Sequence, residues 1–254
     1  MTKVFDSLNE RQISSSKGNR IFTLVLGIIV ALFLTFFILF TTVFYFVEVE
    51  GDSMLNTLHS GDGVVVNRYA DVDRGDVVVI KKMAVKKQRV VLVDGKYDLS
   101  KLQYPCEQIL KVTNEFKDFE WSVNGNILTV KNPEHVTYLE YKSTYSIIKR
   151  VIALEGDSVK LSGGKVYVKF SGQAEYKELK EDYIREQDST FASAGMPSEW
   201  TVGKGQVFYL GDNRRYSEDS TEDGCCNINA VQGVVSQSSI KCKGFTTWLF
   251  KLMG

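Results

Sequence analysis

Residues Ile21 to Val47, IFTLVLGIIVALFLTFFILFTTVFYFV, form a run of 27 positions without a charged residue, His, Asn, Gln or Pro. In a helix, about 20 apolar residues span the roughly 30 Å hydrocarbon core of a bilayer, and a helix satisfies its own backbone hydrogen bonds there. The alternatives are a buried core helix and a cleaved signal peptide. The apolar part of a signal peptide is only about 7–15 residues long and precedes small residues, whereas Phe44, Tyr45 and Phe46 end this run. The run therefore predicts a retained transmembrane helix over residues 21–47.

The charges on either side of the run predict its orientation. Lys17 and Arg20 lie just before it, and Glu48, Glu50 and Asp52 follow it. Basic residues that flank a membrane span stay in the cytoplasm. Residues 1–20 are therefore expected to be a cytoplasmic tail. Residues 48–254 are expected to be an extracytoplasmic domain, so the chain would be a single-pass protein of the cell membrane in contact with the lipid bilayer.

The overall charge narrows the range of partners. The chain has 31 Lys+Arg and 31 Asp+Glu, which gives a formal net charge of zero. Nucleic-acid-binding proteins usually have a basic surplus, so no nucleic-acid partner is expected. Aromatic residues make up 12% of the chain, and with so little net charge this composition favours a packed core over disorder.

Short β-branched runs separated by Gly, Asn and Asp dominate the extracytoplasmic part, which is typical of strands. Val47–Glu50 alternates apolar and acidic residues, the period of a half-buried strand. Further candidate strands lie at Val64–Val66, Val77–Ile80, Arg89–Val93, Ile127–Val130, Tyr145–Leu154, Ser158–Leu161, Lys165–Phe170, Gln206–Leu210 and Gly233–Val235. We therefore predict a mainly β fold, an antiparallel β-sheet domain behind one N-terminal transmembrane helix.

Three stretches depart from this pattern. Cys106–Phe119 has apolar residues at helical spacing, which predicts a helix. Glu175–Gln187 is rich in charge and is expected to be a surface helix or a loop. Gly244–Gly254 is too short to span a bilayer, and we favour a packed core element there over a segment at the membrane interface.

The cysteines all fall in the extracytoplasmic part. They are Cys106, Cys225, Cys226 and Cys242. An oxidising compartment permits disulfides, and four cysteines allow three pairings. Adjacent cysteines cannot easily pair with each other, so a link from Cys225 or Cys226 to Cys242 is one hypothesis and the pairing stays open. No metal site is expected, because neither histidine has a finger-like spacing from the cysteines.

Histidine is too scarce to favour a classical serine-protease triad. Only His59 and His135 occur, and the chain has no G-x-S-x-G motif; His59 is expected in a partly exposed loop. Lysine is the known alternative base for a catalytic serine. Free lysine has a pKa near 10.4, so a lysine base must lie in apolar surroundings that lower its pKa.

Lys149 is the candidate base, and Ser53 is the candidate nucleophile. On a strand, Lys149 shares its face with Ile147, Val151 and Ala153, although a lysine at a sheet edge can also extend its amine to solvent. Ser53 lies in the turn-forming sequence Gly51-Asp52-Ser53, six residues beyond the apolar run. A tight turn there could expose the hydroxyl and aim backbone N–H groups at an oxyanion.

Four blocks of sequence together resemble the bacterial type I signal peptidases of the single-span kind. They follow the membrane segment in that family's order: Val49–Leu58, Gly61–Val66 with Arg74–Val79, Ile148–Asp157, and Tyr209–Ser220. The resemblance covers the apolar segment and about half of the extracytoplasmic chain. Residues 81–145 and about 162–205 are unmatched and are interpreted as insertions that form a non-catalytic subdomain.

The resemblance implies a membrane-bound serine endopeptidase with the signal-peptidase type of antiparallel β-sheet. Ser53 would be the nucleophile and neutral Lys149 the general base, with no metal or organic cofactor. Ser217 would orient Lys149, Asp219 would pair with Arg150, and Asp212 would support the turn of the last block.

The resemblance also implies the substrates, secretory pre-proteins with small residues at positions −1 and −3. Ile148 and Leu58 are the candidates for the pocket walls, although both could be plain core residues. The backbone N–H of Ser53 would form part of the oxyanion hole, and Gly51 replaces a hydroxyl residue that some members have there.

Three positions depart from the family pattern. Asn56 replaces a usual Pro, Ala153 a usual Gly, and Thr221 an Arg that could pair with Asp219. These departures and the long insertion keep an alternative open, a catalytically impaired relative that assembles pili or another secreted polymer. A soluble Ser-Lys autoprotease of the repressor-cleaving class shares the chemistry but lacks the apolar segment.

Overall fold

The computed structural model describes residues 2–114, 117–132 and 137–241, with residues 2–20 described by their backbone alone. It consists of two compact units, Met1–Tyr45 and Phe46–Gly254. The predicted C-terminal element over Gly244–Gly254 lies outside the described residues, as do Cys242 and His135.

The first unit is the single helix α1, Thr2–Val43. Its segment Ile21–Val43 has a mean hydropathy of 2.9 and none of it is buried inside the protein, so it is long and apolar enough to cross a membrane. The helix ends four residues before the predicted boundary at residue 47, because Phe44–Glu48 forms strand β1. Aromatic and β-branched residues in this stretch suit a strand, so the apolar run continues past the helix into the β domain.

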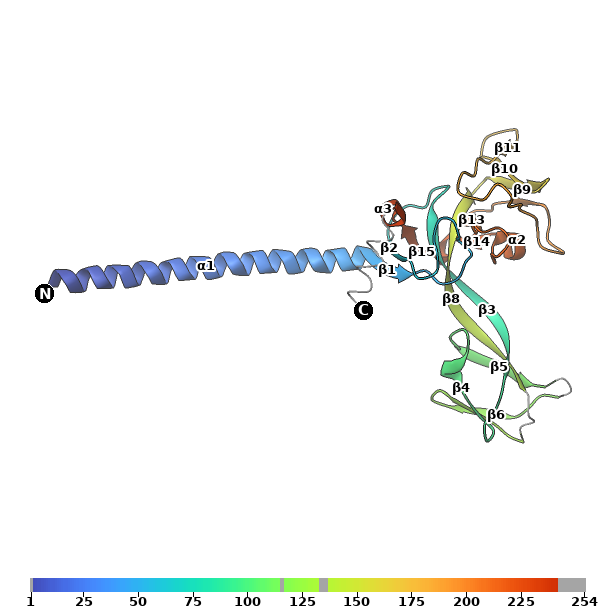
Figure 1. Ribbon diagram of the computed structural model, residues 1–254, viewed down its shortest axis with the longest axis horizontal. Coiled ribbons are helices and arrows are strands. Elements are labelled where there is room, and N and C mark those ends of the chain that lie inside the picture. The colour runs from blue at the N-terminus through green and yellow to red at the C-terminus, as the bar shows by residue number, and fades with distance from the viewer. Residues whose placement is uncertain (1, 115–116, 133–136, 242–254) are drawn as a thin grey trace. The chain divides into compact units, whose positions relative to one another are not determined.

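The second unit is built around one large antiparallel sheet (Figure 1). Its strands follow the order β1-β2-β15-β3-β8-β13-β14, and β5 also pairs with β8. The bounds of these strands are β2 Gly63–Asn67, β3 Val77–Val90, β5 Gln108–Thr113, β8 Thr137–Leu154, β13 Gln206–Leu210, β14 Cys226–Asn227 and β15 Val231–Val235. The prediction of a mainly antiparallel β fold behind an apolar helix is confirmed.

Strands β3 and β8 form a long two-stranded ribbon, paired from Val77 with Arg150 to Val90 with Thr137. Its distal half carries a small sheet of order β4-β7-β6, with bounds β4 Lys96–Asp98, β6 Trp121–Asn124 and β7 Ile127–Val130, and the 3-10 turn Leu99–Lys101 (Figure 1). This region has its own core, which includes Leu128, Leu139 and Tyr141. Residues 81–145 therefore pack as a structural unit on the ribbon.

The helix predicted over Cys106–Phe119 is wrong, because β5 occupies Gln108–Thr113. The register of β5 against β8 shifts between Ile109 and Lys111, which marks a bulge. A bulge lets Ile109 and Val112, three residues apart, both face the core. Three-residue spacing in this strand therefore imitates the period of a helix.

A third sheet of order β11-β10-β9-β12 covers the other end of the second unit (Figure 1). Its strands are β9 Ser158–Ser162, β10 Lys165–Lys169, β11 Lys177–Glu178 and β12 Glu199–Thr201. Glu175–Gln187 is a loop apart from the two residues of β11, which settles the choice between helix and loop. The remaining elements are α2 Ser220–Asp223, the 3-10 turn Ile228–Ala230 and α3 Gln237–Lys241.

Candidate active site

Ser53 lies in a tight turn that buried apolar residues fix to the protein. Met54 and Leu58 are almost fully buried on either side of the turn. The N–H of Leu58 donates to the carbonyl of Met54 at 2.8 Å, and Gly51 has a φ of 78°, a left-handed conformation that glycine adopts without strain. The apolar neighbours thus anchor the turn, while Ser53 stays partly exposed.

Lys149 lies on β8, between β3 and β13 in the middle of the large sheet. Its side chain is in apolar surroundings and the residue is only 2% exposed. Val151, on the same strand face, packs in a cluster with Val78, Ile80 and Tyr209. Lys149 is therefore a core residue and does not extend to solvent at a sheet edge.

The predicted apolar lane beside Lys149 is only partly correct. Ile147 and Val151 pack in one cluster, whereas Ala153 packs in the other core cluster together with Ile152. The register between β8 and β13 shifts between Phe208 and Tyr209. This bulge interrupts the two-residue alternation on which the prediction depended.

The sheet and the turn bring the two candidate groups together. Nζ of Lys149 donates to Oγ of Ser53 at 2.7 Å and to the carbonyl of Ile148 at 3.0 Å, although the residues are 96 positions apart in sequence. Burial lowers the pKa of Lys149 from 10.5 to about 8, against a partial opposing effect of the Asp219 carboxylate. At this pKa about a tenth of the amines is neutral at pH 7, against less than about a thousandth for a free lysine, so Lys149 can accept a proton there.

Arg150 contacts residues of the other three sequence blocks, including the Thr57 hydroxyl at 3.3 Å, but its ion-pair partner differs from the predicted one. Nε and Nη2 of Arg150 donate to Asp212 at 2.8 and 2.6 Å, and Nη1 donates to the carbonyl of Gly75 at 2.7 Å. The Thr57 hydroxyl also donates to Asp212. The forked ion pair is thus between Arg150 and Asp212, both buried, and the predicted pairing with Asp219 is wrong.

Asp219 instead holds the backbone of the last block. One of its oxygens accepts from the N–H of Gly211 at 3.0 Å, and the other caps α2 by accepting from the N–H and the hydroxyl of Thr221. Thr221 therefore satisfies the carboxylate where the family pattern has an arginine. Asp219 is 2% exposed, and its charge raises the pKa of Lys149.

The structure does not place the predicted hydrogen bond between Ser217 and Lys149. Oγ of Ser217 is buried and has no hydrogen-bond partner among the described residues. Lys149 directs its amine to Ser53 and to the Ile148 carbonyl instead. Ser217 packs against Gly211, next to the backbone of Ser53.

Two residues that fix the nucleophile were missed by the sequence reasoning. Asn213 donates from its N–H to the carbonyl of Ser53 at 3.0 Å and from its side-chain amide to the carbonyl of Asp52 at 2.9 Å. Thr57 connects the turn to Asp212. Both residues lie inside the sequence blocks that resemble the family, and this position could have marked them as site residues. Their contacts could not be predicted, because the contacts join segments that are far apart in the sequence.

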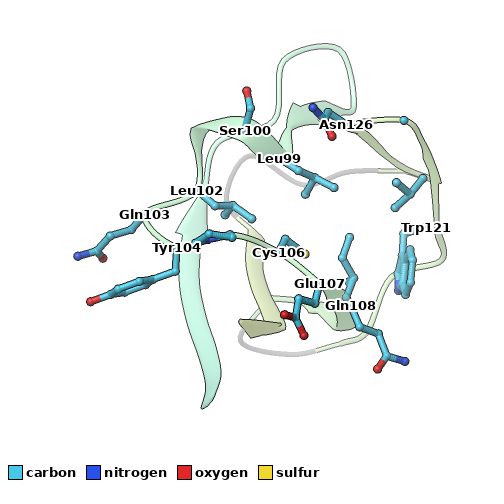
Figure 2. Close-up of a pocket in the computed structure, with 14 residues that line it drawn as sticks. Leu99, Ser100, Leu102, Gln103, Tyr104, Cys106, Glu107, Gln108, Trp121 and Asn126 are labelled. Carbon is cyan, nitrogen blue, oxygen red and sulfur yellow. The ribbon is translucent and has the colours of Figure 1, made fainter. Parts of the chain in front are cut away.

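The predicted pocket walls differ in their exposure. Leu58 is fully buried and serves as a core residue, whereas Ile148 is half-buried beside the dyad. A polar pocket of about 570 Å³ borders the serine turn, lined by Asp52, Leu55, Arg185, Gln187, Asp188, Asn213, Arg215 and Tyr216. The pocket in Figure 2 is formed by the distal unit, where Tyr104, Cys106 and Trp121 line it, and its lining contains neither Ser53 nor Lys149.

The substitution of Asn56 for proline has a structural reason. Asn56 has a φ of 88°, which the proline ring excludes. Its side-chain oxygen accepts from Nε of Arg185 at 3.0 Å. The turn is therefore held by this contact in place of the stiffness of a proline ring.

The remaining candidate groups lie apart from the dyad. His59 is exposed in the turn region after Leu58. Cys106, Cys225 and Cys226 are free thiols, and the predicted partner Cys242 lies outside the described residues. None of the described cysteines takes part in the Ser53 and Lys149 contacts.

Comparison with known proteins finds a matching family and several related sequences. The model of the signal peptidase family, peptidase S26, matches residues 21–240. Signal peptidase I V of Bacillus subtilis (strain 168) is 25% identical over 175 residues, which cover 63% of this chain and 94% of that protein. The probable signal peptidase I-1 of Synechocystis sp. is 36% identical over 96 residues, 38% of this chain and 43% of that protein.

A solved structure and a plastid protein are also similar to the chain. The thylakoidal processing peptidase 1 of Arabidopsis thaliana is 35% identical over 94 residues, 37% of this chain and 24% of that protein. The crystal structure of a signal peptidase I from Enterococcus faecalis V583 is 27% identical with a TM-score of 0.30, and covers 37% of this chain and 86% of that chain. Because the family model spans most of its length, this protein belongs to the signal peptidase family, peptidase S26, and is a hydrolase of the class that removes signal peptides.

Proposed function

We propose that this signal peptidase is a membrane-anchored serine endopeptidase in which Ser53 is the nucleophile and neutral Lys149 is the general base. The observation that carries this proposal is the 2.7 Å distance between Nζ of Lys149 and Oγ of Ser53, together with the burial of Lys149, which is only 2% exposed. A buried, deprotonated amine at that distance can accept the proton of the Ser53 hydroxyl.

The reaction follows from the two groups. Oγ of Ser53 attacks the scissile carbonyl carbon while its proton passes to Nζ of Lys149, which gives a tetrahedral intermediate. Collapse of the intermediate breaks the C–N bond, and the ammonium of Lys149 returns the proton to the leaving amine. Lys149 then takes a proton from water, whose oxygen attacks the ester carbonyl. When this second intermediate breaks its C–O bond, the Lys149 ammonium returns the proton to Oγ of Ser53, and the signal peptide leaves as an acid that loses its proton to solvent.

The backbone N–H of Ser53 is the proposed donor to the oxyanion. No acceptor among the described residues takes a hydrogen bond from it, so it is free to bind the developing negative charge. Gly51 contributes no side-chain donor. Asn213 fixes the carbonyls of Asp52 and Ser53, and so the orientation of the neighbouring peptide groups.

The proposed substrates are secretory pre-proteins with small residues at −1 and −3, and Ile148 is the proposed wall of the pocket for one of them. The proposed setting is the outer face of the cell membrane. Lys17 and Arg20 before the apolar segment and acidic residues after it support a cytoplasmic N-terminus. Ser53 lies ten positions after Val43, the last residue of α1, and at about 3.5 Å per residue this tether keeps the serine within about 35 Å of the helix end.

The first prediction concerns the dyad itself. In detergent, Ser53→Ala and Lys149→Ala should each lower the cleavage of a purified pre-protein by at least about 10³-fold, because each removes a group that acts on the reacting atoms. Lys81→Ala is the matched control, an exposed lysine on β3 that should cleave at the wild-type rate. Cleavage is measured by gel mobility and by mass spectrometry of the new N-terminus.

The same experiment separates the alternatives. Wild-type cleavage by either dyad variant would contradict the proposed mechanism. A wild-type protein that does not cleave any pre-protein would favour the catalytically impaired assembly factor.

A further inference from the structure

A second lysine lies on the same face of the sheet as Lys149. Lys82 of β3 is paired with Tyr145 of β8, and Tyr145 and Lys149 are four residues apart on that strand. Residues at even separations on a strand share a face. Lys82 stands in the sequence Lys81-Lys82, which suggests a solvated pair, yet its side chain is only 14% exposed.

Lys82 contacts the segment that contains the end of the last sequence block and the helix α2. Its Nζ donates to Asp223, the last residue of α2, and lies 3.9 Å from Oε2 of Glu218. The hydroxyl of Tyr145 also donates to Glu218, at 3.3 Å. The segment Glu218–Asp223 is thus held against both strands of the ribbon by polar contacts.

This segment is connected to the nucleophile. It contains Asp219, which accepts from the N–H of Gly211. A Cβ placed on Gly211 would lie 2.6 Å from the Ser53 carbonyl, so Gly211 is in close contact with the serine turn. Through these contacts, a displacement of the segment would move the surroundings of Ser53.

We propose that Lys82 is a positioning residue of the catalytic centre, which holds the segment Glu218–Asp223 on the β3–β8 ribbon and supplies a fixed positive charge that favours the neutral form of Lys149. This inference rests on the proposed role of Lys149 as general base. It adds to that role a second lysine that never touches the substrate and acts only through Lys149 and the segment.

The charges around Lys149 support this role. Besides burial, the carboxylates of Asp219, Glu218 and Asp212 raise the pKa of Lys149, and Lys82 lowers it. The positive charge of Lys82 repels the positive charge of protonated Lys149. Removal of Lys82 would therefore favour the protonated form of Lys149.

The partners of Lys82 do not cancel its effect. Glu218 and Asp223 are about half exposed, with side-chain exposures of 53% and 43%, so solvent screens both. The other titratable groups near Lys82 are Tyr145, Glu222, Cys226 and Lys86, whose Nζ lies 3.9 Å from Oε2 of Glu218. Removal of Lys82 would leave Asp223 without its lysine partner and Glu218 with Lys86 alone, so the acidic group would favour the Lys149 ammonium more strongly.

The test is the pH dependence of kcat/KM for the full-length protein in detergent, measured from pH 6 to 10.5 with one pre-protein. Lys82→Met should move the ascending limb of the pH profile to higher pH by about half to one unit. This shift lowers kcat/KM by roughly 3- to 10-fold at pH 7. Near pH 10 the rate should return to within about twofold of wild type. Lys82→Arg keeps the charge and should restore the wild-type profile, and Lys81→Met on the opposite face is the control.

Glu218→Gln provides a second, independent readout. It removes a carboxylate that favours the Lys149 ammonium, so its limb should move to lower pH. If Lys82→Met fails to fold, as judged by circular dichroism, Lys82→Gln replaces it, because glutamine also removes the charge but keeps a polar side chain, and the same shift of the limb is expected.

Two results would overturn the inference about Lys82. One is a Lys82→Met profile that superimposes on wild type, and the other is an equal loss of activity at every pH, which a merely structural role would give. If Ser53→Ala or Lys149→Ala cleaves at the wild-type rate, the proposed function itself fails. If both are inactive while Lys82→Met and Glu218→Gln leave the limb in place, only the role of Lys82 fails.

Discussion

At the scale of single residues, the burial of Lys149 carries a free-energy cost that the protein bears for its chemistry. Folding lowers the pKa of this amine from 10.5 to about 8. Between these two pH values the unfolded chain binds more protons than the folded one, so the contribution of Lys149 to stability rises with pH through this window. Below pH 8 the full cost is present, and above pH 10.5 it is gone.

Lys149→Met should therefore stabilise the fold while it abolishes activity. The difference in pKa corresponds to about 3 kcal/mol at pH 7, and methionine fills a similar volume without a charge. Urea unfolding followed by tryptophan fluorescence should show a more stable variant at pH 7 and a smaller difference from wild type at pH 10. A variant that is less stable than wild type at pH 7 would show that Lys149 is not held in an unfavourable environment.

The residues of the dyad could be predicted from sequence, whereas their supporting contacts could not. Ser53 and Lys149 each lie in a recognisable block, and scarcity of histidine left lysine as the base. The partner of Arg150 depends on which of two buried aspartates its guanidinium reaches. That choice is made by the turn of residues 211–219, where Asp219 is used to cap α2 and Asp212 is left to face Arg150.

At the scale of elements, the site depends on a close approach between the last block and the serine turn. Gly211 follows β13 directly, and a Cβ there would lie 2.6 Å from the Ser53 carbonyl, closer than real Cβ atoms approach a backbone oxygen. The backbone of the turn cannot give way easily, because Met54 and Leu58 anchor it in the core.

Gly211→Ala should therefore displace the turn and lower kcat by at least about tenfold, because small misplacements of a nucleophile cost that much or more. Gly203→Ala is the matched control, since the three atoms nearest its added Cβ all belong to the flexible side chain of Gln206. Single-turnover cleavage, with circular dichroism to verify folding, distinguishes the two. Equal rates for both variants would mean that the approach at Gly211 does not position the serine.

Element boundaries show where sequence periodicity fails. The run of apolar residues predicts one helix that ends at residue 47, but Phe44–Glu48 forms a strand. Aromatic residues occur in membrane helices and in strands, so the apolar run alone does not mark the boundary. The bulge at Ile109 gives β5 the spacing of a helix, and the bulge opposite Phe208 moves Ala153 away from Lys149. Bulges depend on pairing with a distant strand, so the local sequence does not reveal them.

At the scale of the whole molecule, the chain consists of an apolar helix and a β domain that forms its own compact unit. The full-length protein should remain in the membrane pellet after alkaline carbonate extraction, since about 20 apolar residues hold a helix in the bilayer. Residues 46–254 produced alone should stay in the supernatant. Extraction of the full-length chain by carbonate would contradict an anchored protein, and protease added outside intact spheroplasts should digest the β domain if the proposed orientation holds.

Neutral Lys149 is the proposed general base, and the pH dependence of kcat/KM for wild type is the sharpest test of that role. For wild type, kcat/KM should rise about tenfold per pH unit up to about pH 8 and reach a plateau above that pH. Any residual activity of Lys149→Ala should lack this limb. A limb near pH 6.5, as for histidine, or the same limb in wild type and in Lys149→Ala, would contradict the account.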